Sequence, residues 1–280
     1  MTGFEYYKAA SLDDAVTVLG RCDLPVCPVA GGTNIVANIR RGSQTPALLM
    51  DISGISELRG ITETNDGRIC LGALTTIKEL AESTLISKKA HALHQAANQF
   101  ADPTNRRIAT VGGNLCNASP GADSAPPLLV YDAELIIQGQ NSERAVPLEK
   151  FFTGSFKTAL ISGELLKQLE FTPREHSAFI KLGHRNSMAI SITTVAVAYE
   201  KHDGVLKNCR IAYGASGPTP LRAYLTEKLF ENRELSDDLF KEAEESLAED
   251  LSPRDGLRGS LKYRRNVAGT LLRRAILCAC

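Results

Sequence analysis

The sequence predicts a mixed α+β fold, and three observations support that prediction. Over the first 172 residues, short apolar runs typical of strands alternate with amphipathic helical patterns. Alternating β-branched residues between Ser177 and Ser216 then predict an antiparallel meander of strands. From Arg222 onward the pattern becomes helical. We therefore divide the chain into regions 1–57, 58–172 and 173–280. No internal repeat or low-complexity linker separates these regions, so we expect them to pack closely.

The first region contains one predicted helix and two predicted strands. Residues 11–21 read SLDDAVTVLGR, which places Ser11 as the N-cap and acidic residues in the first turn of a short helix. The segments VCPVAGG (26–32) and PALLMDIS (46–53) are typical of short buried strands. A glycine-rich loop lies between these two strands.

The second region alternates strands and helices. GRICLGALTTIKELAEST (67–84) predicts a strand, a turn and a helix capped by Thr75 or Thr76. KKAHALHQAANQFA (88–101) has helical spacing and stops before Pro103. The segment 126–152 predicts a short helix and then two strands joined by a turn at 139–142.

The third region is predicted to be a meander followed by two helices. An Asp203–Gly204 turn joins two of the strands. LSDDLFKEAEESLAEDL (235–251) predicts an amphipathic helix capped at Ser236, with the charged run 241–250 on its solvated face. Residues 260–279 predict a second helix.

Composition excludes several classes of function. Lys plus Arg equals Asp plus Glu at 32 each, so no net positive field favours nucleic acid or an anionic membrane. No apolar run approaches the roughly 20 residues that span a bilayer, and the first residues lack the pattern of a secretory signal. The seven cysteines are scattered, which favours reduced thiols and a cytoplasmic protein. Cys278 and Cys280 form a terminal CxC that is either a frayed tail or a metal ligand pair.

Two Gly-Gly pairs, in AGGTNI (30–35) and TVGGNL (110–115), are the candidate functional motifs. Paired glycines permit positive φ angles and let backbone N–H groups converge on an anion. Neither pair has the Lys-Ser/Thr ending of a phosphate-binding P-loop or the GxGxxG spacing of a dinucleotide-binding turn. Each pair therefore forms either a tight turn or one half of a clamp for a diphosphate.

Longer segments carry a resemblance to a known family. PVAGGTNIVANIRRG, GALTTIKEL, IATVGGNLCNASPGADSAPPLLVYDAEL, IKLGHRNSMAISITTVAVA, GPTPLRA and YRRNVAGTLLRRAI occur in this order. In this respect the chain resembles the FAD-binding medium subunits of molybdenum hydroxylases, such as those of carbon monoxide, xanthine and nicotinate dehydrogenases. The resemblance covers almost the whole chain. It implies two FAD-binding subdomains (1–57 and 58–172) of the vanillyl-alcohol-oxidase (PCMH) type. Residues 173–280 would form a C-terminal domain with a three-stranded antiparallel sheet and helices.

The resemblance also implies a set of cofactor-binding residues. The first glycine segment would wrap the FAD pyrophosphate, and the second would form an opposing cradle. Asp123 would bind a ribose hydroxyl or another polar group on the adenosine side, and Lys181 would lie near the flavin ring. The segment 184–191 would approach the ring and the electron acceptor. The full set is Val29, Ala30, Gly31, Gly32, Thr33, Asn34, Ile35, Val36, Phe100, Ala101, Thr110, Val111, Gly112, Gly113, Asn114, Asp123, Leu166 and Lys181.

The implied function is electron transfer. In such enzymes a large molybdenum-cofactor subunit hydroxylates the substrate with oxygen from water. Electrons pass through two [2Fe–2S] clusters of a small subunit to FAD, and from there to NAD⁺ or another acceptor. A dimer of heterotrimers is expected, with a purine or another N-heteroaromatic compound as substrate. We expect this chain to contribute no catalytic side chain and no metal ligand.

Two alternatives stay open: a self-sufficient FAD oxidoreductase of the same fold, and a flavin-free assembly subunit. The first loop offers Thr33 where related oxidases often link flavin through His, so we expect noncovalent FAD. Cys116 is expected to be a buried filler rather than a flavin link.

Overall fold

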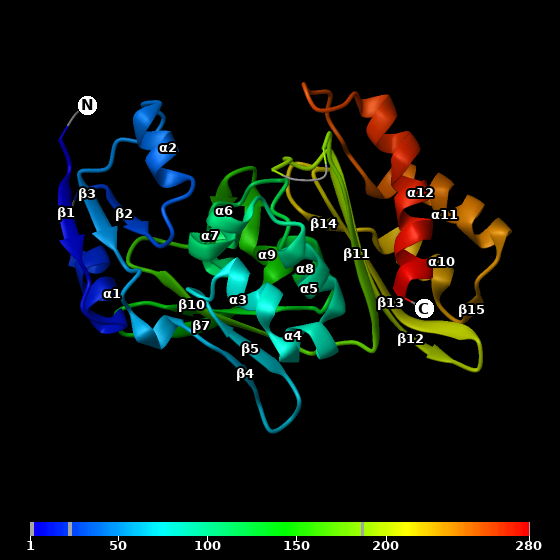
Figure 1. The fold of residues 1–280 in the computed structure, drawn as a ribbon, viewed down its shortest axis with the longest axis horizontal. Coiled ribbons are helices and arrows are strands. Elements are labelled where there is room, and N and C mark those ends of the chain that lie inside the picture. Colours follow the sequence, from blue (N-terminus) through cyan, green and yellow to red (C-terminus); the bar gives the residue numbers. More distant parts are fainter. Residues whose placement is uncertain (1–2, 22–23, 186–187, 280) are drawn as a thin grey trace.

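The computed structural model describes residues 3–21, 24–185 and 188–279. Its sheets lie in a row along the long axis of the molecule, from the N-terminal part through a middle part to the C-terminal part (Figure 1). The mixed α+β class predicted from the sequence is confirmed. Cys22 and Cys280, and the two positions 186 and 187 of the segment 184–191, lie outside the described residues.

The N-terminal part is a three-stranded parallel sheet in the order β1-β3-β2. It consists of β1 (Glu5–Lys8), β2 (Val26–Val29) and β3 (Leu48–Asp51), with the helices α1 (Leu12–Arg21) and α2 (Ile35–Arg40) in the connections. The Ser11 hydroxyl accepts a hydrogen bond from the Asp14 amide at 3.1 Å, which confirms the predicted N-cap of α1. A 3₁₀ helix, η1 (Ser56–Leu58), follows β3.

The middle part is a five-stranded antiparallel sheet in the order β4-β5-β10-β6-β7. Its strands are β4 (Ile61–Glu63), β5 (Ile69–Gly72), β6 (Glu134–Gln138), β7 (Glu143–Pro147) and β10 (Leu165–Phe171). The connection from β5 to β6 is helical and contains α3 (Ile77–Glu82), α4 (Thr84–Lys89), α5 (His91–Asn98), α6 (Pro103–Ile108), α7 (Val111–Cys116) and α8 (Ala125–Val130). Between β7 and β10 lie α9 (Leu148–Phe151), β8 (Phe152–Gly154) and β9 (Lys157–Thr158).

The C-terminal part is built on the three long strands β11 (His176–Leu182), β12 (Thr193–His202) and β13 (Val205–Gly214), as predicted. Asp203 and Gly204 both have positive φ, which confirms the predicted turn between β12 and β13. The short strands β14 (Leu221–Arg222) and β15 (Arg233–Glu234) also pair with β13. The helices are α10 (Tyr224–Phe230), α11 (Asp237–Asp250) and α12 (Leu261–Ala279).

The sheet of β11, β12 and β13 is buried on both faces, which couples the middle and C-terminal parts. Phe179, Ala196 and Ala198 belong to the apolar core of the middle part. Their neighbours Val195 and Val197 belong to the core beneath the C-terminal helices. Successive side chains of a strand point to opposite faces, so one strand serves two cores.

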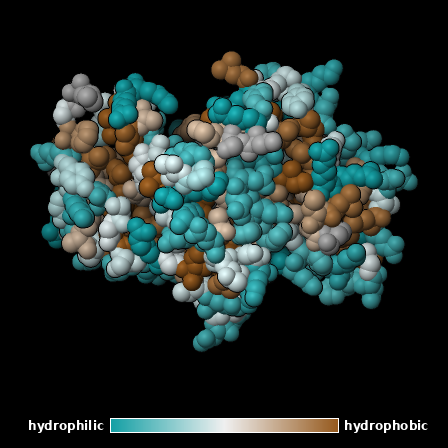
Figure 2. All heavy atoms as spheres, viewed as in Figure 1, coloured by the Kyte–Doolittle hydropathy of each residue, from teal (hydrophilic) through white to brown (hydrophobic). Residues whose placement is uncertain are grey.

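In the space-filling view, hydrophobic atoms gather over the N-terminal and C-terminal parts, whereas hydrophilic atoms cover much of the middle (Figure 2). Among the described residues, no helix combines the length and apolar character needed to cross a membrane.

Candidate functional site

The first glycine segment lies between β2 and α2 and faces the middle part of the molecule. Gly32 has a φ of +70°, a value that glycine adopts without strain. Gly31 has no room for a side chain, because a Cβ there would lie 1.7 Å from the carbonyl oxygen of Ile108, the last residue of α6. The loop of the N-terminal part is therefore packed directly against the chain that leads into the second glycine segment.

The amide groups of this first segment are available to a ligand. The N–H groups of residues 31–34 donate to no acceptor among the described residues. Thr33 and Asn34 are exposed, and Asn34 directly precedes α2 without capping it through its side chain. A run of amide donors without protein acceptors around a positive-φ glycine is the backbone arrangement that binds anions.

A hollow of about 550 Å³ opens beside this loop and is lined by residues of α2 and α6. Val36 and Ile108 contribute apolar side chains that are 44% and 48% exposed. Polar groups come from the loop, from two arginines at the end of α2, and from α6. The lining residues are Gly31, Gly32, Thr33, Val36, Ala37, Arg40, Arg41, Asn105 and Ile108.

The second glycine segment is the start of a helix rather than a tight turn. The helix α6 ends at Ile108, and Thr110 then caps α7 by accepting a hydrogen bond from the Gly113 amide at 3.0 Å. The amides of Val111 and Gly112 donate to the carbonyl oxygens of Thr75 and Ala73, and the Asn114 amide donates to the Thr110 carbonyl. The backbone donors of this segment are thus engaged within the protein.

The two glycines of α7 have different surroundings. A Cβ on Gly112 would lie 2.6 Å from the carbonyl oxygen of Ala73 and 2.7 Å from its Cβ. Gly113 is exposed, and a Cβ there would approach only the Thr110 hydroxyl, at 2.8 Å. Gly112 is therefore required for packing, whereas Gly113 leaves an exposed surface without a side chain.

Asn114 follows Gly113 and is oriented by Ser124. Its Oδ1 accepts a hydrogen bond from the Ser124 hydroxyl at 2.5 Å. The side-chain N–H₂ group of Asn114 has no acceptor among the described residues, so it is available as a donor beside Gly113.

Asp123 and Lys181, which the resemblance placed at different parts of the cofactor, contact each other. Lys181 Nζ donates to Asp123 Oδ2 at 2.6 Å and to the Gln99 carbonyl oxygen at 3.2 Å. The Ser191 hydroxyl donates to the other carboxylate oxygen, Oδ1, at 2.6 Å. The side chains of Lys181 and Asp123 are 8% and 9% exposed. Asp123 belongs to the middle part and both of its donors belong to the C-terminal part, so this buried group joins the two.

Burial dominates the electrostatics of Asp123. Desolvation raises the pKa of its carboxyl, and the charge of Lys181 and the hydrogen bonds from Lys181 and Ser191 only partly oppose that rise. A carboxylate in this position depends on its partners to stay ionised.

The other predicted residues lie apart from the hollow. Ala101 has a φ of +39°, and its carbonyl oxygen accepts a hydrogen bond from the Met188 amide at 3.3 Å. Phe100 packs against the core of the middle part, and Leu166 is a member of that core with only 4% exposure.

Sequence reasoning missed several residues of this region. Ser191 stood at the end of the segment 184–191 but carried no assigned role. Ile108 and Asn105 give no sequence signal, because their place beside the first loop depends on how α6 packs against Gly31.

Cys116 has the surroundings of a filler residue. Burial raises the pKa of its thiol to about 12, so the reactive thiolate is scarcely populated at neutral pH. This chemistry is unsuited to a covalent flavin link.

Comparison with known protein families identifies the class of protein. Residues 2–173 match the model described as the FAD binding domain in molybdopterin dehydrogenase, and residues 178–279 match the CO dehydrogenase flavoprotein C-terminal domain. The chain therefore belongs to the family of FAD-binding subunits of molybdenum hydroxylases, and FAD is the cofactor of this fold.

Particular relatives span nearly the whole chain. The xanthine dehydrogenase FAD-binding subunit of Escherichia coli O157:H7 is 35% identical over 276 residues, which are 97% of this chain and 94% of that protein. The carbon monoxide dehydrogenase medium chain of Hydrogenophaga pseudoflava is 28% identical over 99% of this chain and 96% of that protein.

Solved structures show the same fold. A carbon monoxide dehydrogenase chain from Hydrogenophaga pseudoflava, in an enzyme that lacks the Mo-pyranopterin moiety of its molybdenum cofactor, matches with a TM-score of 0.95 and 28% identity. That match covers 99% of this chain and 96% of the other. Quinoline 2-oxidoreductase from Pseudomonas putida 86 matches with a TM-score of 0.93 and 26% identity over 99% and 96% of the two chains.

Proposed function

We propose that this chain is the electron-transfer subunit of a xanthine dehydrogenase-like molybdenum hydroxylase. It receives electrons from a small [2Fe–2S] subunit and passes them to NAD⁺ or another acceptor, while a large molybdopterin subunit hydroxylates a purine or another N-heteroaromatic compound. The assembly is a dimer of heterotrimers in the cytoplasm. Support comes from relatives named as FAD subunits or medium chains of xanthine, nicotinate and carbon monoxide dehydrogenases.

The first glycine segment would hold the diphosphate of FAD. The observation that carries this assignment is the run of N–H groups at residues 31–34, which have no acceptor among the described residues; Gly31, Gly32 and Thr33 also line the hollow. Backbone donors suit a diphosphate because they carry partial positive charge and require no side-chain ordering. Val29, Ala30, Ile35 and Val36 would shape the walls around these donors.

The second glycine segment would let the cofactor approach the backbone closely. The amides of residues 111–114 donate within the protein, so this half of the clamp is assigned to the bare surface of Gly113 and to the side-chain N–H₂ of Asn114. Thr110 and Val111 would hold that surface in place, and Gly112 would fix α7 against Ala73.

Asp123 would accept a hydrogen bond from a ribose hydroxyl. Each carboxylate oxygen can accept more than one hydrogen bond, so the contacts with Lys181 and Ser191 leave acceptor capacity. Because Lys181 contacts Asp123 at 2.6 Å, it would lie at the same part of the cofactor as that carboxylate, which reduces its effect as a cation. Phe100 and Ala101 would supply apolar surface to the cofactor, and Leu166 would lie beneath that surface as part of the core.

Bound FAD would supply the conversion between one-electron and two-electron transfer. The contribution of this chain is to bind and orient the cofactor and to set the charge around it.

Co-purification tests this assignment. Expressing the chain with its neighbouring genes should yield a complex that contains iron–sulfur and molybdenum subunits, and anaerobic addition of the substrate should bleach the flavin absorbance. Substrate turnover by the isolated chain would instead favour a self-sufficient oxidoreductase. A complex that forms without flavin would favour an assembly subunit.

A further inference from the structure

The short helix α8 has a carboxylate at each end, and each carboxylate contacts the C-terminal part. Asp123 lies two residues before α8, and Asp132 lies two residues after it. The helix is fully buried along its length and packs against β11, β12, β13 and β14. At about 1.5 Å per residue, six helical residues separate the two ends by roughly 9 Å.

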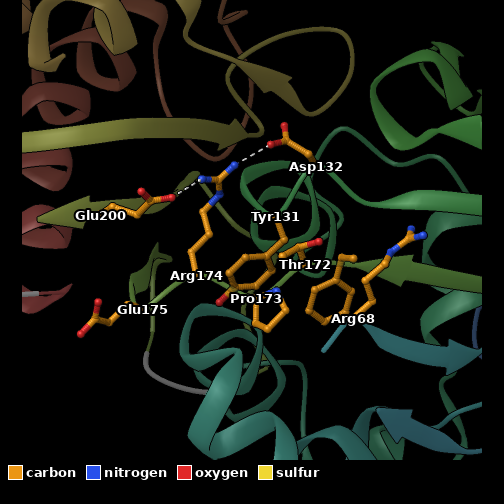
Figure 3. Close-up of a pocket in the computed structure, with 9 residues that line it drawn as sticks. Arg68, Tyr131, Asp132, Thr172, Pro173, Arg174, Glu175 and Glu200 are labelled. Atoms are coloured by element: carbon orange, nitrogen blue, oxygen red, sulfur yellow. Dashed lines mark hydrogen bonds and ion pairs between the residues drawn. The ribbon is translucent and has the colours of Figure 1, made fainter. Parts of the chain in front are cut away.

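Asp132 is surrounded by three arginines. Its Oδ2 accepts a hydrogen bond from Arg174 at 2.8 Å and another from Arg210 at 3.3 Å, and its Oδ1 accepts one from Arg222 at 2.7 Å. Figure 3 shows the Arg174 side chain extending from the chain that follows β10 towards both Asp132 and Glu200. The carboxylate of Asp132 is therefore bound by arginines from three places: the segment between β10 and β11, β13 and β14.

These arginines depend on Asp132 to different degrees. Arg222 is 6% exposed and also pairs with Glu227 through two hydrogen bonds, at 2.5 and 2.7 Å. Arg174 is 16% exposed, its second carboxylate partner Glu200 is 3.6 Å away, and its buried Nε has no hydrogen-bond partner within the described part of the chain. Removing the charge of Asp132 would leave Arg174 without its close partner, and a poorly paired buried cation is costly.

The contact between Asp132 and Arg174 is connected along the chain to the residues proposed to bind FAD. Arg174 lies two residues before β11, the strand that carries Lys181 at its other end. Asp132 thus bonds to the chain just before β11, while Lys181 and Ser191 contact Asp123 at the opposite end of α8.

We propose that Asp132 is a positioning residue for the cofactor site: by holding Arg174, Arg210 and Arg222 at one end of α8, it places Lys181 and Ser191 against Asp123 at the other. This inference rests on the proposed role of Asp123 and Lys181 in binding FAD. It assigns a function to a carboxylate that does not line the hollow and whose side-chain hydrogen bonds, among the described residues, all come from arginines.

A double-mutant cycle on the full chain tests the proposal. Asp132→Asn keeps the shape of the side chain and removes its charge, and Lys181→Met removes the charged partner of Asp123. The matched control is Glu242→Gln, which breaks another pair with an arginine: Glu242 and Arg233 are 46% and 41% exposed, against 45% for Asp132, and lie far along the chain from α8.

FAD titration of the apo chain gives the first readout. Asp132→Asn should raise the Kd for FAD by about tenfold in the parent and by less than about twofold in the Lys181→Met background, because coupled residues are not additive. Glu242→Gln should leave the Kd unchanged in both. An equal effect of Asp132→Asn in both backgrounds, or none in either, would overturn the proposal.

Hydrogen exchange of the apo chain separates this proposal from the proposed function. Asp132→Asn should accelerate amide exchange in β11 and at the start of β12, whereas Glu242→Gln should not. A parent chain that binds no FAD would refute the cofactor assignment, and the exchange result would still decide the role of Asp132. Unchanged exchange in Asp132→Asn would contradict the positioning role whether or not FAD binds.

Discussion

Replacing Gly112 and Gly113 of α7 one at a time should separate effects on the free energy of unfolding from effects on FAD affinity. In Gly113→Ala the new methyl group would lie 2.8 Å from the Thr110 hydroxyl, so the N-cap bond must adjust. Losing an N-cap costs about 1 kcal/mol, while replacing glycine by alanine within a helix gains about 0.5–1 kcal/mol. The free energy of unfolding should therefore change by no more than about 0.5 kcal/mol.

The neighbouring change should behave in the opposite way. In Gly112→Ala the methyl group would lie 2.6 Å from the Ala73 carbonyl oxygen, to which the Gly112 amide donates at 2.9 Å. Overpacking of this kind costs about 1–3 kcal/mol, a weakened hydrogen bond adds about 1 kcal/mol, and the change from glycine to alanine in a helix offsets about 0.5–1 kcal/mol. We expect a loss of about 1–3.5 kcal/mol in the free energy of unfolding.

Two measurements on each variant test the reasoning. Urea unfolding of the apo chain gives stability, and FAD titration gives affinity. Gly113→Ala should weaken FAD binding by about tenfold or more, equivalent to about 1.4 kcal/mol, with nearly unchanged stability. If Gly113→Ala bound FAD like the parent, the bare surface of Gly113 would not face the cofactor. A stability loss in Gly113→Ala as large as in Gly112→Ala would refute the packing distinction between them.

Three further predictions follow from other contacts. Gly31→Ala should separate the first loop from Ile108 and abolish FAD binding in titrations, with a retained far-UV spectrum; unchanged affinity would contradict the close packing of these segments. Desolvation raises the pKa of Asp132, but the arginines around it outweigh that effect, so its pKa is lowered. The pKa of Glu164 is also lowered, by a hydrogen bond from Arg144. The stability from these ionised carboxylates is present at neutral pH and is lost as the pH falls below about 4, so urea unfolding should show a shallower acid loss in Asp132→Asn. Cys116→Ser should release all flavin on acid precipitation, as the parent does; flavin retained by the parent pellet alone would indicate a thioether link.

Local patterns allowed the longer helices and the meander strands to be predicted, whereas β1, α2 and β10 were not predicted. The Thr76 capping box is such a case: its hydroxyl accepts from the Glu79 amide while the Glu79 carboxylate accepts from the Thr76 amide, all within four residues. The helix α11 likewise begins after Ser236, whose hydroxyl accepts from the Leu239 amide at 3.1 Å. Short-range hydrogen bonds of this kind leave their signature in the sequence.

The site depended on contacts that sequence patterns do not encode. Gly112 and Gly113 are identical in the sequence, and only the approach of Ala73 distinguishes them. Asp123 and Lys181 lie 58 residues apart, so their ion pair follows from the way β11 packs on α8. The family resemblance supplied both residues, whereas their mutual contact and that of Ser191 came from the structure.

The flavin content of the purified chain tests the central claim most directly. After acid precipitation, the supernatant should contain about one FAD per chain, identified as the dinucleotide by chromatography, and the pellet should retain none. A chain that carries no flavin and binds none on titration would contradict the binding of FAD in the hollow beside the first glycine segment. A flavin that stays with the precipitated protein would contradict noncovalent binding.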